Sequence, residues 1–148
     1  MKYVYRFSEG NTSMADLLGG KGANLADMAQ LGLPVPPGFT IDTNACREYL
    51  AGTLDWESFL LQLYKAMSIL ETKVGMRYGG SFNEFPLLVS VRSGAPVSMP
   101  GMMETVLNVG ITAKNIPYMG NPRFSLLTYC EFLGAYGRVV LGQQSERL

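Results

Sequence analysis

The chain has no histidine among its 148 residues and only two cysteines, Cys46 and Cys130. Without histidine, a catalytic triad, a histidine acid–base pair or a phosphohistidine cannot be built from these residues alone. The cysteines lie in unrelated segments and lack a CxxC spacing, which argues against the usual zinc and redox sites. We expect both to be buried free thiols, and any reaction to need other groups or another segment.

The chain also lacks an excess of charge and a long apolar run. Twelve basic and twelve acidic residues cancel, and the pI is near 6.2. No lysine- and arginine-rich run provides an electrostatic surface for nucleic acid or anionic lipid. No segment approaches the length that spans a bilayer, and the N-terminus does not resemble a signal peptide. We therefore expect a cytoplasmic protein that binds neither nucleic acid nor membranes.

Short apolar runs alternate with segments of helical periodicity, and this pattern predicts an α+β fold with one hydrophobic core. Asp42 or Thr43 and Asp55 are the expected helix caps. A break at residues 110 and 111 divides the chain into an α/β part, 1–110, and the start of a helical part, 111–148. The strands are expected at residues 3–7, 39–41, 87–91 and 105–109, and the helices from residue 23 onward and at about 43–50, 56–73 and 124–141.

The two longest predicted helices each carry an apolar stripe. In the helix at 56–73 the stripe consists of Phe59, Leu63, Met67 and Leu70, and helical spacing of this kind indicates core packing rather than a ligand site. In the helix at 124–141, Phe124, Leu127, Phe132, Tyr136 and Val139 lie roughly along one side. That last helix has little within the chain to pack against, which suggests a part of something larger.

Residues 90–110, SVRSGAPVSMPGMMETVLNVG, join two predicted strands through a loop rich in glycine and proline. Glycine lets the backbone approach a ligand closely, and free N–H groups in such a loop can point at phosphate oxygens. Arg92, which we expect to be buried at the end of the first strand, adds a planar fork of donors. A hairpin loop with a surface arginine is the alternative, but the apolar strand before Arg92 favours an anion site.

Residues 19–22, GGKG, precede the helix predicted from residue 23. The unpaired N–H groups and positive dipole of a helix N-terminus favour phosphate, and Lys21 adds a full charge. The motif lacks the spacing of a Walker A loop. Taken alone, it indicates a glycine-rich helix start with a solvated lysine.

Three segments together resemble a known family: LLGGKGANLADMAQLGLPVPPGFTI, PLLVSVRSGAPVSMPGMMETVLNVG and GNPRF. In order and spacing they are similar to the N-terminal part of the nucleotide-binding domain of the pyruvate, phosphate dikinases, over residues 3 to about 140. The GGKG helix start is common to related phosphoenolpyruvate-forming enzymes. The loop after Arg92 is more specific, because phosphoenolpyruvate synthases and glucan, water dikinases carry a more acidic, alanine-rich loop there.

The resemblance implies a partial ATP-grasp-like domain, with a small mixed sheet, flanking helices and the start of a helical subdomain. It implies a phosphotransferase in which ATP and inorganic phosphate phosphorylate a carrier histidine, giving AMP and diphosphate. The phosphohistidine then converts pyruvate to phosphoenolpyruvate. The carrier-histidine and pyruvate-binding domains and the carboxylates that hold Mg²⁺ would lie outside this chain. We therefore expect no catalytic residue and no metal ligand within it, and a homo-oligomeric full-length enzyme.

Carried over to these residues, the resemblance assigns the polyphosphate of ATP to Lys21 and Arg92 and to the backbone around Gly101 and Met102. Glu104 is interpreted as structural, since one acid is a poor magnesium site. Where the family's helix after GNPRF has two adjacent arginines, this chain has Cys130 and Glu131. Two alternatives stay open: a stand-alone nucleotide- or phosphate-binding module without turnover, and a decayed fragment with a structural or interaction role.

Overall fold

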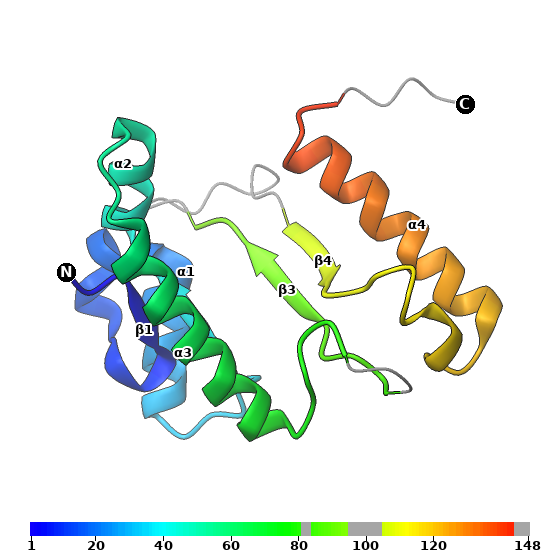
Figure 1. The fold of residues 1–148 in the computed structure, drawn as a ribbon. Coiled ribbons are helices and arrows are strands. Elements are labelled where there is room, and N and C mark those ends of the chain that lie inside the picture. Colours follow the sequence, from blue (N-terminus) through cyan, green and yellow to red (C-terminus); the bar gives the residue numbers. More distant parts are fainter. Residues whose placement is uncertain (81–83, 95–104, 144–148) are drawn as a thin grey trace. The chain divides into compact units, whose positions relative to one another are not determined.

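The computed structural model describes residues 1–80, 84–94 and 105–143. The chain divides into two compact units (Figure 1). The first comprises Met1–Lys73 with Gly94–Met102, and the second comprises Val74–Ser93 with Met103–Leu148. None of the helices in the described residues is both long enough and apolar enough to cross a membrane.

The first unit begins with an antiparallel strand pair, β1 (Val4–Arg6) and β2 (Phe39–Ile41). Val4 pairs with Ile41 and Arg6 with Phe39, so the chain returns to β1 after about thirty residues. Two short 3₁₀ helices, η1 (Phe7–Glu9) and η2 (Thr12–Met14), then lead into α1 (Ala15–Gln30). Both predicted strands are confirmed, and β2 has the predicted bounds.

Two capped helices complete this unit, α2 (Thr43–Ala51) and α3 (Trp56–Val74). The Asp42 carboxylate accepts a hydrogen bond from the Ala45 backbone N–H at 2.8 Å, as an N-cap side chain does. Burial of Asp42 raises the pKa of its carboxyl group above the ordinary value. The Asp55 carboxylate accepts from the Ser58 N–H at 3.1 Å at the start of α3. Both predicted caps are therefore confirmed.

The core of the first unit lies between β1, α2 and α3. Tyr3, Val4, Ala45 and Ala66 are buried together, with Phe59 packed against them. Alanines from the two helices allow a close approach to Tyr3, whose side chain is 2% exposed. The stripe predicted to be core packing on α3 faces inward, with Leu70 buried and its other members half-buried.

The second unit is built on another antiparallel pair, β3 (Val89–Arg92) and β4 (Thr105–Val109). Val89 pairs with Val109 and Arg92 with Thr105, with an irregularity between Val89 and Val91. Within the described residues the strands thus form two separate antiparallel pairs, not the single small mixed sheet we expected. Each sheet has only two strands, so its packing depends on helices.

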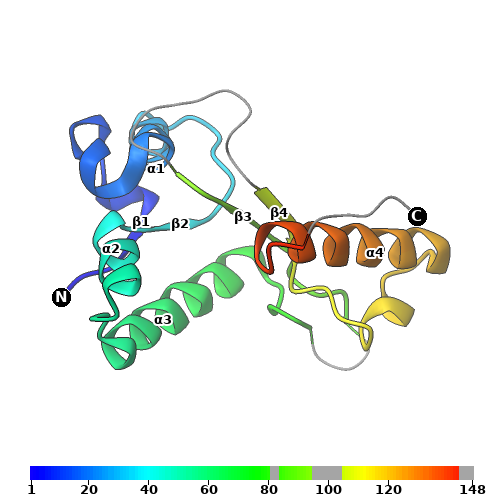
Figure 2. The same ribbon diagram turned by 90° about the horizontal axis from the view of Figure 1, so that it is seen from above.

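A buried asparagine organises the chain after β4. The Asn115 side chain accepts a hydrogen bond from the Thr112 N–H at 2.9 Å. Its amide donates to the carbonyl oxygens of Gly79 and Gly110, each at 3.2 Å. The next elements are η3 (Ile116–Tyr118) and α4 (Pro122–Val139), and α4 packs against β4 (Figure 2).

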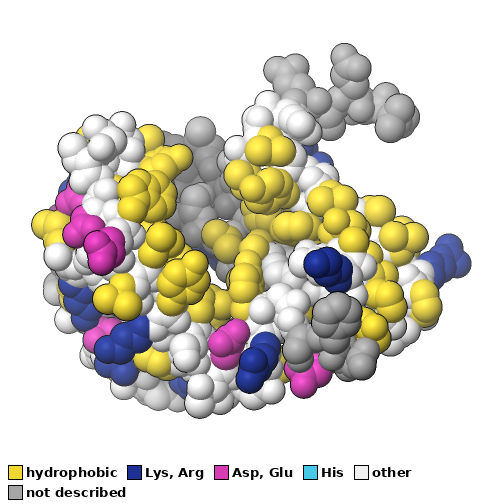
Figure 3. All heavy atoms as spheres, in the orientation of Figure 1, with side chains coloured by type: hydrophobic (Ala, Val, Ile, Leu, Met, Phe, Trp, Pro, Cys, Tyr) yellow, Lys and Arg dark blue, Asp and Glu magenta, His cyan; other side chains and the backbone are white. Residues whose placement is uncertain are grey.

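Small polar residues are the most deeply buried on the contact face of α4, which they share with the half-buried Phe132 and Val139. Ser125 is 0% exposed and Thr128 is buried. In contrast, Phe124 and Leu127 of the predicted stripe are 62% and 56% exposed. In Figure 3 hydrophobic side chains accordingly gather on the outer surface of this helix.

Both cysteines are exposed, which contradicts the expected burial. Cys46 follows the buried Ala45 on α2, and Cys130 lies two residues after the buried Thr128 on α4. A step of one or two residues along a helix turns a side chain by about 100° or 200° away from the face that packs. Both thiols therefore lie on the solvent side of helices whose inner faces are taken by smaller residues.

Candidate functional site

The GGKG segment is a break within a helix. Helix α1 begins at Ala15, eight residues before the expected start, and Gly19 interrupts it with φ 71° and ψ 158°. A positive φ of this kind is readily adopted only by glycine. The helix resumes after Gly19, so the first N–H groups of the resumed segment lack partners inside it. The predicted start at residue 23 is wrong, but residues 19–22 do lie at a helical N-terminus.

The absence of a side chain at Gly22 lets the resumed helix pack closely against β2. A Cβ on Gly22 would lie 2.8 Å from Cγ2 of Thr40, closer than side chains tolerate. Ala23 and Ala26, on the same face, are each 1% exposed. Lys21 therefore projects from a helix whose position is set by small residues on either side of it.

Lys21 is half-buried and has no hydrogen-bond or ion-pair partner among the described residues. It lies in the first turn after the Gly19 break, where the dipole of the helix adds to its positive charge. An ammonium group at this position is available to a ligand. Chemically, the segment offers backbone donors and one cation to an anion.

Gly94, the last described residue before the loop, lies against the Gly19 break. A Cβ built on Gly19 would be 3.6 Å from Cα and 3.7 Å from the carbonyl oxygen of Gly94. Both glycines belong to the first unit. The two segments that the sequence singled out therefore meet by direct backbone contact. A glycine in each segment permits so close an approach, but no sequence pattern pairs Gly94 with Gly19.

Arg92 is exposed at the end of β3, which contradicts the expected burial. Its Nε donates a hydrogen bond to Oγ of Ser90 at 3.3 Å. Ser90, Val91 and Arg92 are all exposed because β3 pairs only with β4 in a sheet of two strands. Among the described residues one weak contact holds the guanidinium group, which leaves most of its donors for another group.

The remaining predicted site residues, Gly101, Met102 and Glu104, lie outside the described residues. Within the part that is described, no three acidic or cysteine side chains gather closely enough to hold a metal ion. Cys130 and Glu131 are both exposed on α4.

The part of the chain that contains the Gly19 break is similar to a known protein family. A family model described as "Pyruvate phosphate dikinase, AMP/ATP-binding domain" matches residues 15–66. The matched residues cover α1, β2, α2 and the first part of α3. Lys21 and its flanking glycines lie inside the match.

Curated relatives extend the similarity over nearly the whole chain. A pyruvate, phosphate dikinase of Clostridium symbiosum is 48% identical over 145 residues, which is 95% of this chain and 16% of the relative. One of Entamoeba histolytica is 42% identical over 151 residues, 99% of this chain and 17% of the relative. A chloroplastic pyruvate, phosphate dikinase of Oryza sativa is 47% identical over 152 residues, which is 95% of this chain and 15% of the relative. The chain thus spans about a sixth of the length of these relatives.

Proposed function

From the relationship of this chain to the AMP/ATP-binding domain of pyruvate, phosphate dikinases, we propose that it is the N-terminal ATP-binding part of such an enzyme. The whole enzyme would convert ATP, pyruvate and phosphate to AMP, phosphoenolpyruvate and diphosphate. The phosphohistidine intermediate would form outside this chain, which contains no histidine. By itself the chain would bind nucleotide without turning it over.

One observation supports the proposal at the level of the site: Gly94 lies against Gly19, which is two residues before Lys21 in the sequence. This contact brings the beginning of the loop to the break in α1. Backbone donors and a partner-free ammonium group there suit the oxygens of a polyphosphate. Phosphoryl transfer depends largely on positioning and charge neutralisation, which such groups provide.

In this proposal Lys21 and Arg92 bind the phosphates of ATP, and the backbone at Gly101 and Met102 wraps the same anion. ATP would supply the phosphoryl groups, and Mg²⁺ would be held by carboxylates outside the chain. Residues 1–110 would form one subdomain of an ATP-grasp-like domain, and residues 111–148 would begin a helical one. A cytoplasmic location and a homo-oligomeric full-length enzyme are part of the same proposal.

The exposed apolar surface of the last helix supports a missing remainder. Contiguous apolar patches on a folded surface commonly mark contacts with another segment. The relatives are about six times as long as this chain, so ample sequence exists in them to cover this helix. The residues concerned are Phe124, Leu126, Leu127, Leu133, Tyr136, Val140 and Leu141, each at least 39% exposed.

Calorimetric titration with Mg-ATP tests the site. We expect Lys21→Ala and Arg92→Ala each to weaken binding at least tenfold, since each removes a charged contact worth about 1.5–3 kcal/mol. Lys65→Ala, on the exposed side of α3, is the matched control and should bind ATP as the unchanged chain does. Unchanged affinity in both site variants would refute the assignment.

A variant at the break tests the backbone contact separately. Gly19→Ala introduces a side chain at a positive φ beside Gly94, and we expect weaker ATP binding with the far-ultraviolet circular dichroism retained. The alternative, a stand-alone binding module, is distinguished by the reading frame after Leu148. A downstream carrier histidine with metal-binding carboxylates supports the dikinase, whereas an immediate stop codon supports the module.

A further inference from the structure

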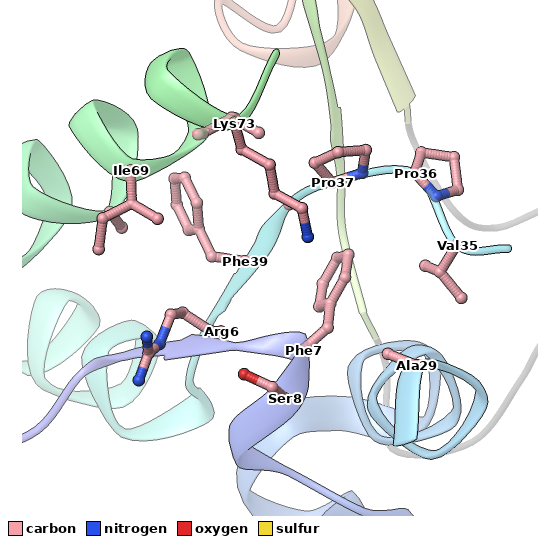
Figure 4. A pocket seen from close by; sticks show the side chains of 13 residues that line it. Arg6, Phe7, Ser8, Ala29, Val35, Pro36, Pro37, Phe39, Ile69 and Lys73 are labelled. Carbon is pink, nitrogen blue, oxygen red and sulfur yellow. The ribbon is translucent and has the colours of Figure 1, made fainter. Parts of the chain in front are cut away.

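The first unit contains a second concave surface, away from the GGKG segment. A pocket of about 310 Å³ lies between the end of β1, the connector before β2 and the inner side of α3 (Figure 4). From α1 only Ala29 lines it, eight residues after Lys21, or roughly 12 Å along the helix at 1.5 Å per residue. Its volume is at the lower end of the range for small-molecule sites. The pocket is therefore separate from the proposed ATP site.

Most residues that line this pocket are apolar, and they are accompanied by Arg6, Ser8, Lys73 and exposed backbone groups. Pro36 and Pro37 line one side, and their rings fix the backbone and supply no N–H donor. The Phe7 ring lies on Gly38, where a Cβ would come within 2.8 Å of Cζ of that ring. Phe39 and Ile69 complete the apolar lining. These groups can cover the body of a small apolar molecule.

Two cationic side chains line the pocket, Arg6 and Lys73, and of these only Lys73 lacks a partner among the described residues. Figure 4 shows the Lys73 side chain extending from the end of α3 toward the Phe7 ring, whereas the Arg6 guanidinium group is turned away. Arg6 is paired with Glu9, with 3.3 Å between its Nε and a carboxylate oxygen. Lys73 has no hydrogen bond or ion pair with any described residue. One positive charge without a partner among the described residues thus lies beside the aromatic rings of the lining.

We propose that this pocket binds a small carboxylate with a compact apolar or aromatic body. One ammonium group matches one carboxylate as a point charge. A phosphate dianion would need several free donors, whereas the prolines provide none and the Arg6 guanidinium group is already paired with Glu9. The apolar body would cover the rings of Phe7 and Phe39, which adds a contribution that an inorganic anion cannot make.

Titration of the 148-residue chain with 3-phenylpropionate, followed by heteronuclear NMR, tests the proposal. We expect saturable shifts at residues of α3 and the proline connector, with a dissociation constant of about 1–5 mM. The matched alcohol, 3-phenyl-1-propanol, should bind at least fivefold more weakly, and inorganic phosphate should give no saturable shift there. Equal binding of acid and alcohol, or no saturation by the acid, would overturn the proposal.

Two variants test whether the acid binds to Lys73 and inside this pocket. Lys73→Met keeps the aliphatic stem and should weaken acid binding at least fivefold, while Lys65→Met, outside the pocket on the same helix, should leave it unchanged. Ile69→Glu puts a carboxylate four residues before Lys73 and should also abolish binding, whereas Leu61→Glu, 71% exposed, should not. Lys21→Ala should bind the acid normally, so failure of the ATP site is distinguishable. Unaltered binding by Lys73→Met and Ile69→Glu would refute the pocket assignment.

Discussion

Helices α3 and α4 are nearly equal in length, 19 and 18 residues, yet they bury opposite kinds of side chain. Helix α3 turns Ala66 and Leu70 into the core of its unit. Helix α4 buries Ser125 and Thr128 most deeply and leaves Phe124 and its leucine side chains exposed. In α3 the apolar stripe finds its partner inside the chain, whereas most of the apolar surface of α4 remains without one among the described residues.

This difference teaches that periodicity locates a helix but does not say which of its faces is occupied. Both helices have an apolar stripe, but the stripe of α4 is only partly used for packing, because Phe132 and Val139 are half-buried whereas Phe124 and Leu127 are exposed. The second stripe is explained if α4 packs on segments present in the longer relatives. The following variants test the contrast, from the largest expected effect to the smallest.

A charge at a buried position of α3 and a charge at an exposed position of the α4 stripe should have very different costs. Ala66→Asp places a carboxylate at a position 8% exposed beside Tyr3 and Val4, and we expect a loss of about 3–4 kcal/mol in unfolding free energy. Leu127→Asp, at a position 56% exposed, should change stability by less than about 0.5 kcal/mol. Urea unfolding followed by circular dichroism measures both. Equal losses would contradict the contrast between the helices.

The small-residue face of α4 should not accept a larger side chain. Ser125 is 0% exposed, and its hydroxyl group donates to the Asn121 carbonyl oxygen at 2.9 Å. Ser125→Leu both overpacks this contact and removes the hydrogen bond, so we expect a loss of about 1–3 kcal/mol. The reverse exchange on the exposed side, Leu126→Ser, is the control for thermal unfolding. A stable Ser125→Leu protein would mean that α4 does not pack by this face.

The caps of the two helices should contribute equally, unlike their faces. The Asn121 side chain accepts from the N–H groups of Arg123 and Phe124 at 3.0 and 3.1 Å, and Asp55 accepts from Ser58 at 3.1 Å. Asp55→Ala and Asn121→Ala should each cost about 1 kcal/mol. Asp55→Asn, which keeps an acceptor oxygen, should cost less in the same denaturant titration. A cost at only one helix would show that capping depends on how the rest of that helix packs.

Acid should weaken the unit that contains α3 through Glu9. The Arg6 guanidinium group, with Lys2, lowers the pKa of the Glu9 carboxyl from 4.5 to about 2. This stabilisation is complete above about pH 4.5 and is lost as the pH falls toward 2. The Lys2 and Arg6 side chains are 48% and 55% exposed, so solvent screens the interaction and we expect only about 0.5 kcal/mol. The fluorescence of Trp56, the one tryptophan, should report this slope on acid titration, and Glu9→Gln should remove it.

Local features of the fold could be predicted from the sequence. The strands at 39–41 and 105–109 and the caps Asp42 and Asp55 agree with the structure. Alternation, turn residues and capping side chains act within a few neighbouring residues, so one sequence contains all the information they need. For the same reason the GGKG segment was recognised as a helical N-terminus.

Burial could not be predicted in the same way. Cys46, Cys130 and Arg92 were expected to be buried and are exposed, because exposure depends on which element packs over a residue. The start of α1 was placed too late, since a glycine at a positive φ can interrupt a helix that has already begun. The roles of Gly101 and Met102 stay predictions.

By itself the sequence determined the type and order of the elements, the absence of histidine chemistry, and the motifs that relate the chain to the dikinases. These features depend on residue identity and short spacings, which can be read from the sequence without knowing the fold. Only the tertiary structure decided that Gly94 meets Gly19, that Lys73 enters a pocket and that α4 packs by its serine and threonine. Each of these features either joins residues that are distant in sequence or selects one face of a helix. Both depend on which surfaces come into contact, and a local sequence pattern does not contain that information.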